Sequence, residues 1–170
     1  PAAAAVARQL LSGLAYVHGQ RVVHRDVKCE NILLGRVNVP LQQNVVKICD
    51  FGFATRDTGD GLSDLLGSPD TVAPEVVGMQ RYSFPVDIWS AGVIIYMMLS
   101  ARSPFYASTD AEVLARVRTG KYNLSGRPWC NVSSPAKSMI TSLMTFNPSL
   151  RPTAAEALKN LWLEGAAGAP

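Results

Sequence analysis

The stretch Val22–Leu34, VVHRDVKCENILL, places a dense group of polar residues between two runs of branched apolar residues. Short β-branched runs bounded by Gly, Pro or Asn are typical of brief strands. We therefore expect extended segments at 22–23, 32–34 and 45–48. The polar residues then lie on a loop held by strands, and their number calls for a chemical reason.

The rest of the chain predicts a mainly helical fold. Apolar residues recur every three to four positions from Ala4 to His18, which indicates an amphipathic helix that closes at Gly19. A cluster of Gly, Asp, Ser and Thr at 55–69 is typical of a loop. Four further helix starts are predicted from Pro and capping signals: Ser83 with Pro85, Thr109 with Glu112, Ser134 with Pro135, and Thr153 with Glu156.

Composition sets bounds on the class of protein. With 170 residues and 48% hydrophobic content, the chain has the size of one globular domain. Its net charge of +3 comes from scattered residues, so we expect neither nucleic acid nor a membrane as a partner. The longest apolar run, Ala91–Leu99, is about half of the ~20 residues that a bilayer span needs, and indicates a buried core helix.

The three cysteines, Cys29, Cys49 and Cys130, lie far apart and form no CxxC pair. This spacing argues against a disulfide framework or a cysteine metal site and favours a reducing compartment. We therefore expect a cytoplasmic location, with the nucleus left open.

Three short motifs occur in a fixed order along the chain. Residues 24–31 read HRDVKCEN, residues 50–52 read DFG and residues 73–75 read APE; DIWSAG follows at 87–92, and Arg151 lies near the end. Together they resemble the C-terminal lobe of a eukaryotic-type protein kinase. The resemblance covers essentially residues 1–170 and implies a protein-kinase-like α+β fold. This chain would be the mainly α-helical C-lobe, with a few short strands around the catalytic loop.

Phosphoryl transfer needs oxygen ligands for Mg²⁺, a carboxylate beside the attacking hydroxyl and a cation near the transferred group. The resemblance implies that Asp26 accepts the proton of the substrate hydroxyl and that Lys28 steadies the γ-phosphoryl group of ATP. It implies that Asn31 and Asp50 hold Mg²⁺, and that Leu33 lies beneath the adenine ring. Lys28, two positions after Asp26, is the serine/threonine-kinase arrangement.

Other positions resemble structural rather than catalytic residues of the family. His24 and Phe51 resemble members of a hydrophobic spine, and Asp87 resembles a helix residue that hydrogen-bonds the catalytic-loop backbone. Glu75 and Arg151 resemble a buried ion pair, whose disruption costs about 3–5 kcal/mol because one charge is left unpaired.

Two more family positions concern packing and backbone shape. Gly52 is expected to let the backbone turn sharply after the metal ligand Asp50. Ile94 and Met98 resemble residues that pack behind Leu33, and an ordinary core role explains them equally well.

Substrate recognition is implied at Glu30 and Ser68. Glu30 resembles an acid that pairs with a basic residue upstream of the phosphoacceptor, whereas Met97 lacks the second acid found there. Ser68 stands where Thr is more common and keeps a hydroxyl that would bridge Asp26 and Lys28. Cys29, in place of Pro, and Thr71, in place of an aromatic residue, depart from the family pattern, and Thr71 weakens the expected peptide-docking loop.

Regulation is implied around Arg25. Asp64 stands where related kinases carry a phosphorylated threonine, and Arg25 is the cation that such a phosphate would meet. Asp64 therefore either mimics the phosphate or is a solvated loop acid. The phosphorylation sites that remain open are Ser63, Thr58 and Thr55.

The helical stretch 85–105 and the tail 127–163 look most like the calcium/calmodulin-dependent group of kinases. We expect protein substrates with Ser or Thr acceptors, and calmodulin regulation outside this chain. The Gly-rich loop and strand lysine of an N-lobe are missing, so the chain alone should have negligible activity. A pseudokinase or truncated fragment acting as a protein-binding scaffold is the alternative. A small-molecule phosphotransferase would not explain the APE segment or Arg151.

Overall fold

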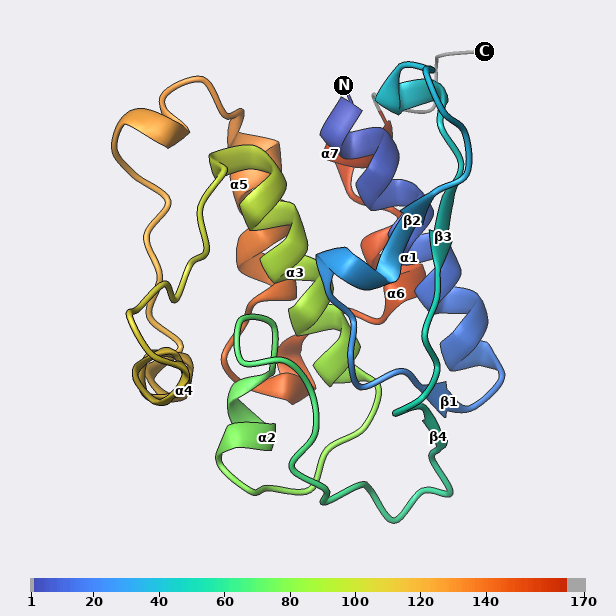
Figure 1. Ribbon diagram of the computed structural model, residues 1–170, viewed down its shortest axis with the longest axis vertical. Helices are drawn as coiled ribbons and strands as arrows, with labels where there is room; N and C mark the ends of the chain where they lie inside the picture. The colour runs from blue at the N-terminus through green and yellow to red at the C-terminus, as the bar shows by residue number, and fades with distance from the viewer. Residues whose placement is uncertain (1, 165–170) are drawn as a thin grey trace.

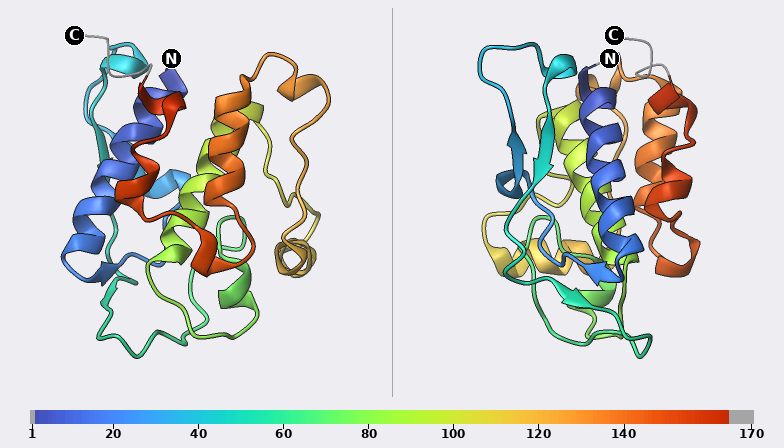
Figure 2. Two further views of the ribbon diagram at one scale, coloured as in Figure 1. Left: turned by 180° about the vertical axis from the view of Figure 1, so that it is seen from behind. Right: turned by 90° about the vertical axis from the view of Figure 1, so that its right-hand side faces the viewer.

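A computed structural model of the chain describes residues 2–164, and Figure 1 shows the arrangement of its elements. Helices α1 (Ala2–Gly19) and α3 (Pro85–Ser100) contact each other, and α5 (Ser134–Leu143) packs against α3. The short helices α6 (Ala154–Ala157) and α7 (Leu161–Glu164) lie along α1, as the rear view in Figure 2 shows. The predicted mainly helical fold with a few short strands is confirmed.

Helix α1 follows the predicted apolar stripe. Ala7, Leu10, Leu11 and Leu14 are fully buried, whereas Tyr16 on the other face is exposed. The helix begins two residues before the predicted start, because the alanines that precede the stripe have the highest helix propensity. Its buried face carries the contacts to α3, α6 and the strands.

Helix α3 is buried along most of its length because other elements cover several of its faces. The run Ala91–Ile95 is fully buried, which confirms the predicted core helix. At Gly92 a Cβ would lie 2.6 Å from Met144 and 2.9 Å from Leu143, so only glycine allows α5 to approach this closely. Among the described residues, none of the helices has the length and apolar character needed to cross a membrane.

Two small antiparallel sheets hold the loops in front of α1 and α3. Strand β2 (Ile32–Leu34) pairs with β3 (Val46–Ile48), and β1 (Val22–Val23) pairs with β4 (Thr55–Arg56). The first three strands lie where the sequence predicts them. Strand β4 lies in the stretch predicted as loop, and that prediction is wrong at these two residues because a two-residue strand has no periodicity to detect.

The remaining helices are α2 (Pro74–Val77) and α4 (Asp110–Thr119). The predicted capping box is complete at α6, where Thr153 and Glu156 cap each other's backbone. At α4 only half of it forms: Thr109 accepts from the Glu112 amide, but the Glu112 carboxylate accepts from the Ser108 amide instead.

One predicted helix start is displaced by one residue, and at another the predicted serine does not cap the helix. The N-cap of α5 is Ser133, whose hydroxyl accepts from the Ala136 amide, and Ser134 is already helical. Pro85 begins α3 as predicted, but the residue before it is Phe84, and Ser83 turns its hydroxyl to the Asp57 carboxylate. The local sequence therefore does not determine which serine caps α5 or what Ser83 binds. The path of the chain around each serine determines both.

Candidate active site

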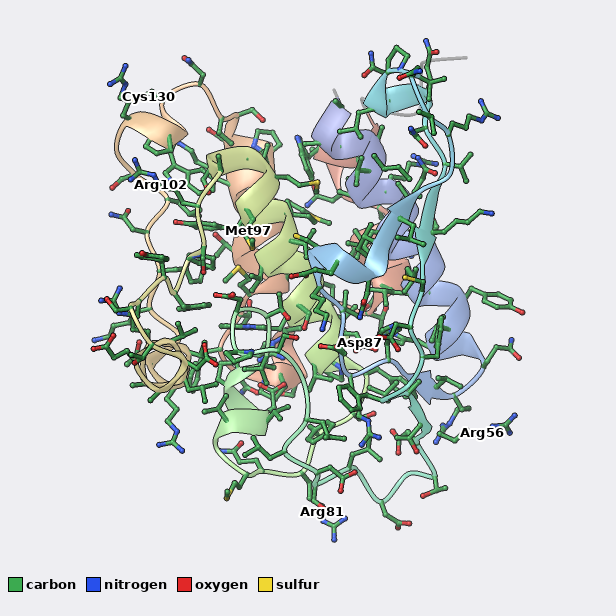
Figure 3. The ribbon with its side chains drawn as sticks, in the orientation of Figure 1. Arg56, Arg81, Asp87, Met97, Arg102 and Cys130 are labelled. Atoms are coloured by element: carbon green, nitrogen blue, oxygen red, sulfur yellow. The ribbon has the colours of Figure 1, made fainter. Side chains whose placement is uncertain are left out.

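The loop between β1 and β2 is anchored to α3 by Asp87, which Figure 3 labels. The Asp87 carboxylate accepts hydrogen bonds from the backbone amides of His24 and Arg25, each at 2.9 Å. Its Oδ2 also lies 2.9 Å from Nε2 of His18 at the end of α1. Arg25 has the left-handed φ of 68°, a strained value for a residue with a Cβ, and these contacts hold it there. The predicted backbone contact of Asp87 is confirmed.

Asp26, Lys28 and Ser68 form one hydrogen-bonded group. Lys28 Nζ lies 2.8 Å from Asp26 Oδ2, and it donates to Ser68 Oγ at 3.0 Å. The Ser68 hydroxyl donates to Asp26 Oδ1 at 2.9 Å. The expected bridge by Ser68 is therefore present, and it ties the loop 24–31 to the segment 50–75.

Gly67 makes that bridge possible. It has a φ of 115°, and a Cβ at this position would lie 2.9 Å from the backbone oxygen of Arg25. Only glycine accepts both the left-handed conformation and the close approach. Ser68 is thereby brought against the loop that carries Asp26.

The surroundings of Asp26 keep it ionised. Burial alone would raise the pKa of this carboxyl, but hydrogen bonds from Lys28 and Ser68 outweigh burial and lower the pKa below its usual range. The hydrogen bond to Asp26 in turn raises the pKa of Lys28. At neutral pH the pair is a carboxylate beside an ammonium group.

Asn31 and Asp50 offer oxygen atoms that fit Mg²⁺. Asn31 Nδ2 donates to the backbone oxygen of Asp26 at 2.9 Å and to its carboxylate at 3.3 Å, so the amide oxygen must point elsewhere. Asp50 is exposed and uses only Oδ1, as acceptor of the Gly52 amide at 3.2 Å. Amide and carboxylate oxygens are the ligands that Mg²⁺ prefers.

The DFG motif contains one left-handed residue and one turn. Asp50 itself has the left-handed φ of 58°, whereas Gly52 does not have a positive φ. Gly52 itself lies in the turn 51–54, which the Ala54 amide closes on the Phe51 oxygen, so the turn expected after Asp50 is present. Gly52 also places its amide on Asp50, and a Cβ there would approach the Asp50 carboxylate at 3.1 Å.

Arg25 joins the loop to the segment 50–75 by two contacts, and it also contacts Tyr82. Its Nε donates to the Phe53 oxygen at 2.6 Å, and its Nη1 lies 2.7 Å from the Asp64 carboxylate and 3.4 Å from the Tyr82 hydroxyl. The Tyr82 hydroxyl donates to the Asp64 backbone oxygen at 2.8 Å. The expected meeting of Arg25 and Asp64 occurs, and Ser63 beside it is exposed.

Glu75 and Arg151 form the predicted buried ion pair. Two parallel hydrogen bonds of 2.6 and 2.8 Å join the guanidinium to the carboxylate, and the two side chains are 0% and 2% exposed. Arg151 also donates to three backbone oxygens, and its guanidinium lies 4.9 Å from the centre of the Trp89 ring. The pair joins the end of the segment 50–75 to the start of α3 and to the chain that follows α5, because Arg151 also bonds backbone oxygens there.

The remaining predicted residues differ in their exposure to solvent. His24 is buried, and its ring centre is 4.7 Å from that of Phe51, which is 45% exposed. Leu33 on β2 is 50% exposed, and Glu30 is exposed next to Lys28. An apolar surface at Leu33 and Phe51 is available to a further element or a ligand.

The comparisons with known proteins agree with this geometry. A family model described as the protein kinase domain matches residues 1–163. The chain belongs to the protein kinase domain family. The resemblance inferred from the three motifs is thus confirmed.

Curated relatives within this kinase family include enzymes named for calcium. A calcium and calcium/calmodulin-dependent serine/threonine-protein kinase of Oryza sativa subsp. japonica is 39% identical over 164 residues, covering 96% of this chain and 31% of the relative. A probable myosin light chain kinase of Dictyostelium discoideum is 40% identical over 161 residues, covering 94% and 45%. The chain spans less than half the length of these relatives.

Two residues of the site were not predicted from the sequence. His18 contacts Asp87, and Tyr82 contacts both Arg25 and Asp64. His18 occupies the last turn of a predicted helix, and that position alone gives no sign of a partner in α3. Tyr82 meets Arg25 only through the path of the segment 50–75, which local sequence does not encode.

Proposed function

We propose that the protein of which this chain is part transfers the γ-phosphate of Mg-ATP to Ser or Thr hydroxyls of protein substrates. The observation that carries this proposal is the group formed by Asp26, Lys28 and Ser68, with Asn31 bonded to Asp26. It combines a carboxylate, a cation and an amide oxygen within one loop, which is the set that phosphoryl transfer requires.

In this proposal Asp26 is the catalytic base. Its lowered pKa keeps it ionised, so it can orient the substrate hydroxyl and accept its proton. Lys28 neutralises charge on the transferred phosphoryl group, and Ser68 holds both side chains in place. Asn31 and Asp50 would hold Mg²⁺, which supplies charge neutralisation on the phosphate oxygens when it is bound. Leu33 would contact the adenine ring.

The substrate preference and regulation are part of the same proposal. Exposed Glu30 next to Lys28 favours a basic residue upstream of the acceptor. The Asp64 carboxylate would replace a regulatory phosphate on Arg25, and Ser63 would be an added phosphorylation site. We also propose a cytoplasmic or nuclear location, and calmodulin control through parts of the protein outside residues 1–170.

The alternative function is a pseudokinase scaffold that binds proteins without transferring phosphate. The exposed apolar residues Leu33, Phe51 and Phe53 favour a binding role for this edge. A scaffold, however, has no need for a base and two metal ligands in bonding positions.

A phosphorylation assay on the full-length protein tests the proposal. Peptides with Ser, Thr or Tyr acceptors are supplied with Mg-ATP, with Arg upstream or absent. We expect phosphate on Ser and Thr, and a loss of about 10²–10⁴-fold in kcat for Asp26→Asn. The matched control Asp60→Asn changes a carboxylate of the same segment that lies outside this group and should leave the rate unchanged.

Two outcomes would contradict the proposal. Absence of phosphate transfer by a folded full-length protein that still binds protein partners would favour the scaffold. Transfer that survives Asp26→Asn would exclude Asp26 as the base. The 170-residue chain assayed alone should transfer negligible phosphate, because the Lys–Glu pair that orients the α and β phosphates in kinases lies outside it.

A further inference from the structure

One hollow includes His18 in its wall but none of the residues Asp26, Lys28, Asn31, Asp50 and Ser68. It has a volume of about 440 Å³ and lies between the end of α1, the start of α3 and the segment 151–155 that leads into α6. Figure 2 shows this segment crossing behind α3 to reach α1. Volumes of this size are typical of small-molecule sites.

Apolar groups form most of the wall of this cavity. The apolar lining residues are Ala15, Phe84, Pro85, Ile88, Pro152, Ala154 and Ala155. Arg151 also lines it, but its guanidinium is bound to Glu75 and to backbone oxygens. The cavity therefore presents no free charge from Arg151 and suits an uncharged ligand.

His18 supplies a polar group in this apolar wall. Its ring centre is 5.1 Å from that of Phe84, with the planes tilted by 47°. Because the Asp87 carboxylate only accepts, Nε2 of a neutral His18 must be the donor, and Nδ1 then carries a lone pair. Among residues 2–164, no side chain or backbone group donates to this Nδ1. A ligand with an N–H or O–H group could do so.

The same histidine connects the cavity to the catalytic loop. Asp87 Oδ2 contacts both His18 Nε2 and the His24 amide, and Asp87 Oδ1 contacts the Arg25 amide. A ligand that binds Nδ1 polarises the imidazole and strengthens the bond from Nε2 to Asp87. The competing bonds from Asp87 to the loop amides must then change.

We propose that this cavity binds a compact, uncharged aromatic molecule with one N–H or O–H donor, and that binding is transmitted to the catalytic loop through His18 and Asp87. The aromatic ring would pack on Phe84 and Ile88, and the donor would reach His18 Nδ1. Binding itself does not depend on the proposed kinase activity.

Indole and benzothiophene are the probes that test it. They have nearly the same shape, but only indole has an N–H donor. In nuclear magnetic resonance titrations of the ¹⁵N-labelled 170-residue chain, we expect saturable indole binding with a sub-millimolar dissociation constant. Shifts should occur at the amides of Ala15 and Ile88 and also at those of His24 and Arg25. Benzothiophene should bind about 3–10-fold more weakly, the effect of one hydrogen bond, and should leave the two loop amides unmoved.

Two variants and one control variant localise the effect. Ala155→Phe adds a ring at an exposed position in the cavity lining and should abolish binding, whereas Ala111→Phe on the exposed face of α4 should not. His18→Phe keeps an aromatic ring but removes both nitrogens. Indole and benzothiophene should then bind with equal affinity, and indole should no longer shift the amides of His24 and Arg25. Nuclear Overhauser contacts between indole and Phe84 give a readout that does not depend on any variant.

Three results would overturn the proposal. The first is the absence of saturable indole binding below about millimolar concentration. The second is equal binding of the two probes to the unaltered chain, which excludes the bond to His18. The third is binding in the cavity without any change at His24 and Arg25, which excludes the transmission through Asp87.

Discussion

The molecule holds the segment 50–75 by two arginine–carboxylate pairs that differ in burial. Arg151 and Glu75 are 0% and 2% exposed, whereas Arg25 and Asp64 are 9% and 64% exposed. Both pairs have contacts below 3 Å. The two pairs therefore have similar contact distances and differ in their exposure to solvent.

The difference assigns the pairs separate roles. The buried pair has no water to replace a lost partner, so it acts as a permanent structural joint. The exposed pair is screened by solvent and salt, so it can form and break at small cost. A contact of this second kind is the one that the proposed regulatory role of Arg25 and Asp64 requires.

The largest expected effect is that of Glu75→Ala. This change leaves the Arg151 guanidinium buried without its carboxylate, and we expect the free energy of unfolding to fall by about 3–5 kcal/mol. Urea denaturation followed by circular dichroism measures the loss. The matched control is Glu30→Ala, an exposed acid, which should stay within about 0.5 kcal/mol. A loss below about 1 kcal/mol at Glu75 would remove the contrast between the pairs.

Ser68→Ala should give an intermediate effect that depends on pH. Asp26 loses one donor to its carboxylate, which costs about 1.5–3 kcal/mol at neutral pH. The folded-state pKa of Asp26 is lowered, so the stabilising contribution is present above the unfolded-state pKa and is lost as pH falls through the folded-state value. The difference in the free energy of unfolding between Ser68→Ala and the unaltered chain should therefore become smaller as the solution is acidified.

Urea titrations at a series of pH values from neutral to acidic check this expectation. Carbon-13 titration of Asp26 should also show its pKa moving up in Ser68→Ala, because one of the bonds that lowers it is gone. A difference in the free energy of unfolding that does not change with pH would mean that the Ser68 hydroxyl stabilises the fold by packing and not by its hydrogen bond to the Asp26 carboxylate.

The smallest expected effect is that of Asp64→Asn. The Asp64 side chain is 64% exposed, so its pair with Arg25 should contribute about 0.2–1 kcal/mol, and this amount should vanish in 1 M salt. Urea midpoints at low and high salt test it, with the neighbouring Ser63→Ala as control. An effect equal to that of Glu75→Ala, or one indifferent to salt, would show that the two pairs are held alike.

The sequence predicted the residues of the candidate site better than the long-range contacts that hold them in place. The motifs at 24–31, 50–52 and 73–75 are readable because the chemistry restricts the residue type at fixed spacing. The buried pair of Glu75 and Arg151, which lie 76 positions apart, could be expected only through the family resemblance. Composition and periodicity contain no information about such a contact.

The errors have physical causes that can be named. Ser133 and Ser134 are chemically equivalent caps, and the path of the preceding loop selects the first. The left-handed conformation in the DFG motif falls on Asp50, a residue with a Cβ, and no local sequence signal predicts it. Tyr82 and His18 could not be predicted because their partners are brought to them by the tertiary fold.

The anchoring of the catalytic loop by Asp87 has a consequence for synthesis. The amides of His24 and Arg25 must wait for a carboxylate that is 63 and 62 positions further along the chain. At about 5–20 residues per second, a ribosome needs roughly 3–12 s to reach it. During that interval the side chains of the loop are present, but the backbone hydrogen bonds to Asp87 are not. The loop 24–31 therefore cannot be anchored until the ribosome has made the start of α3.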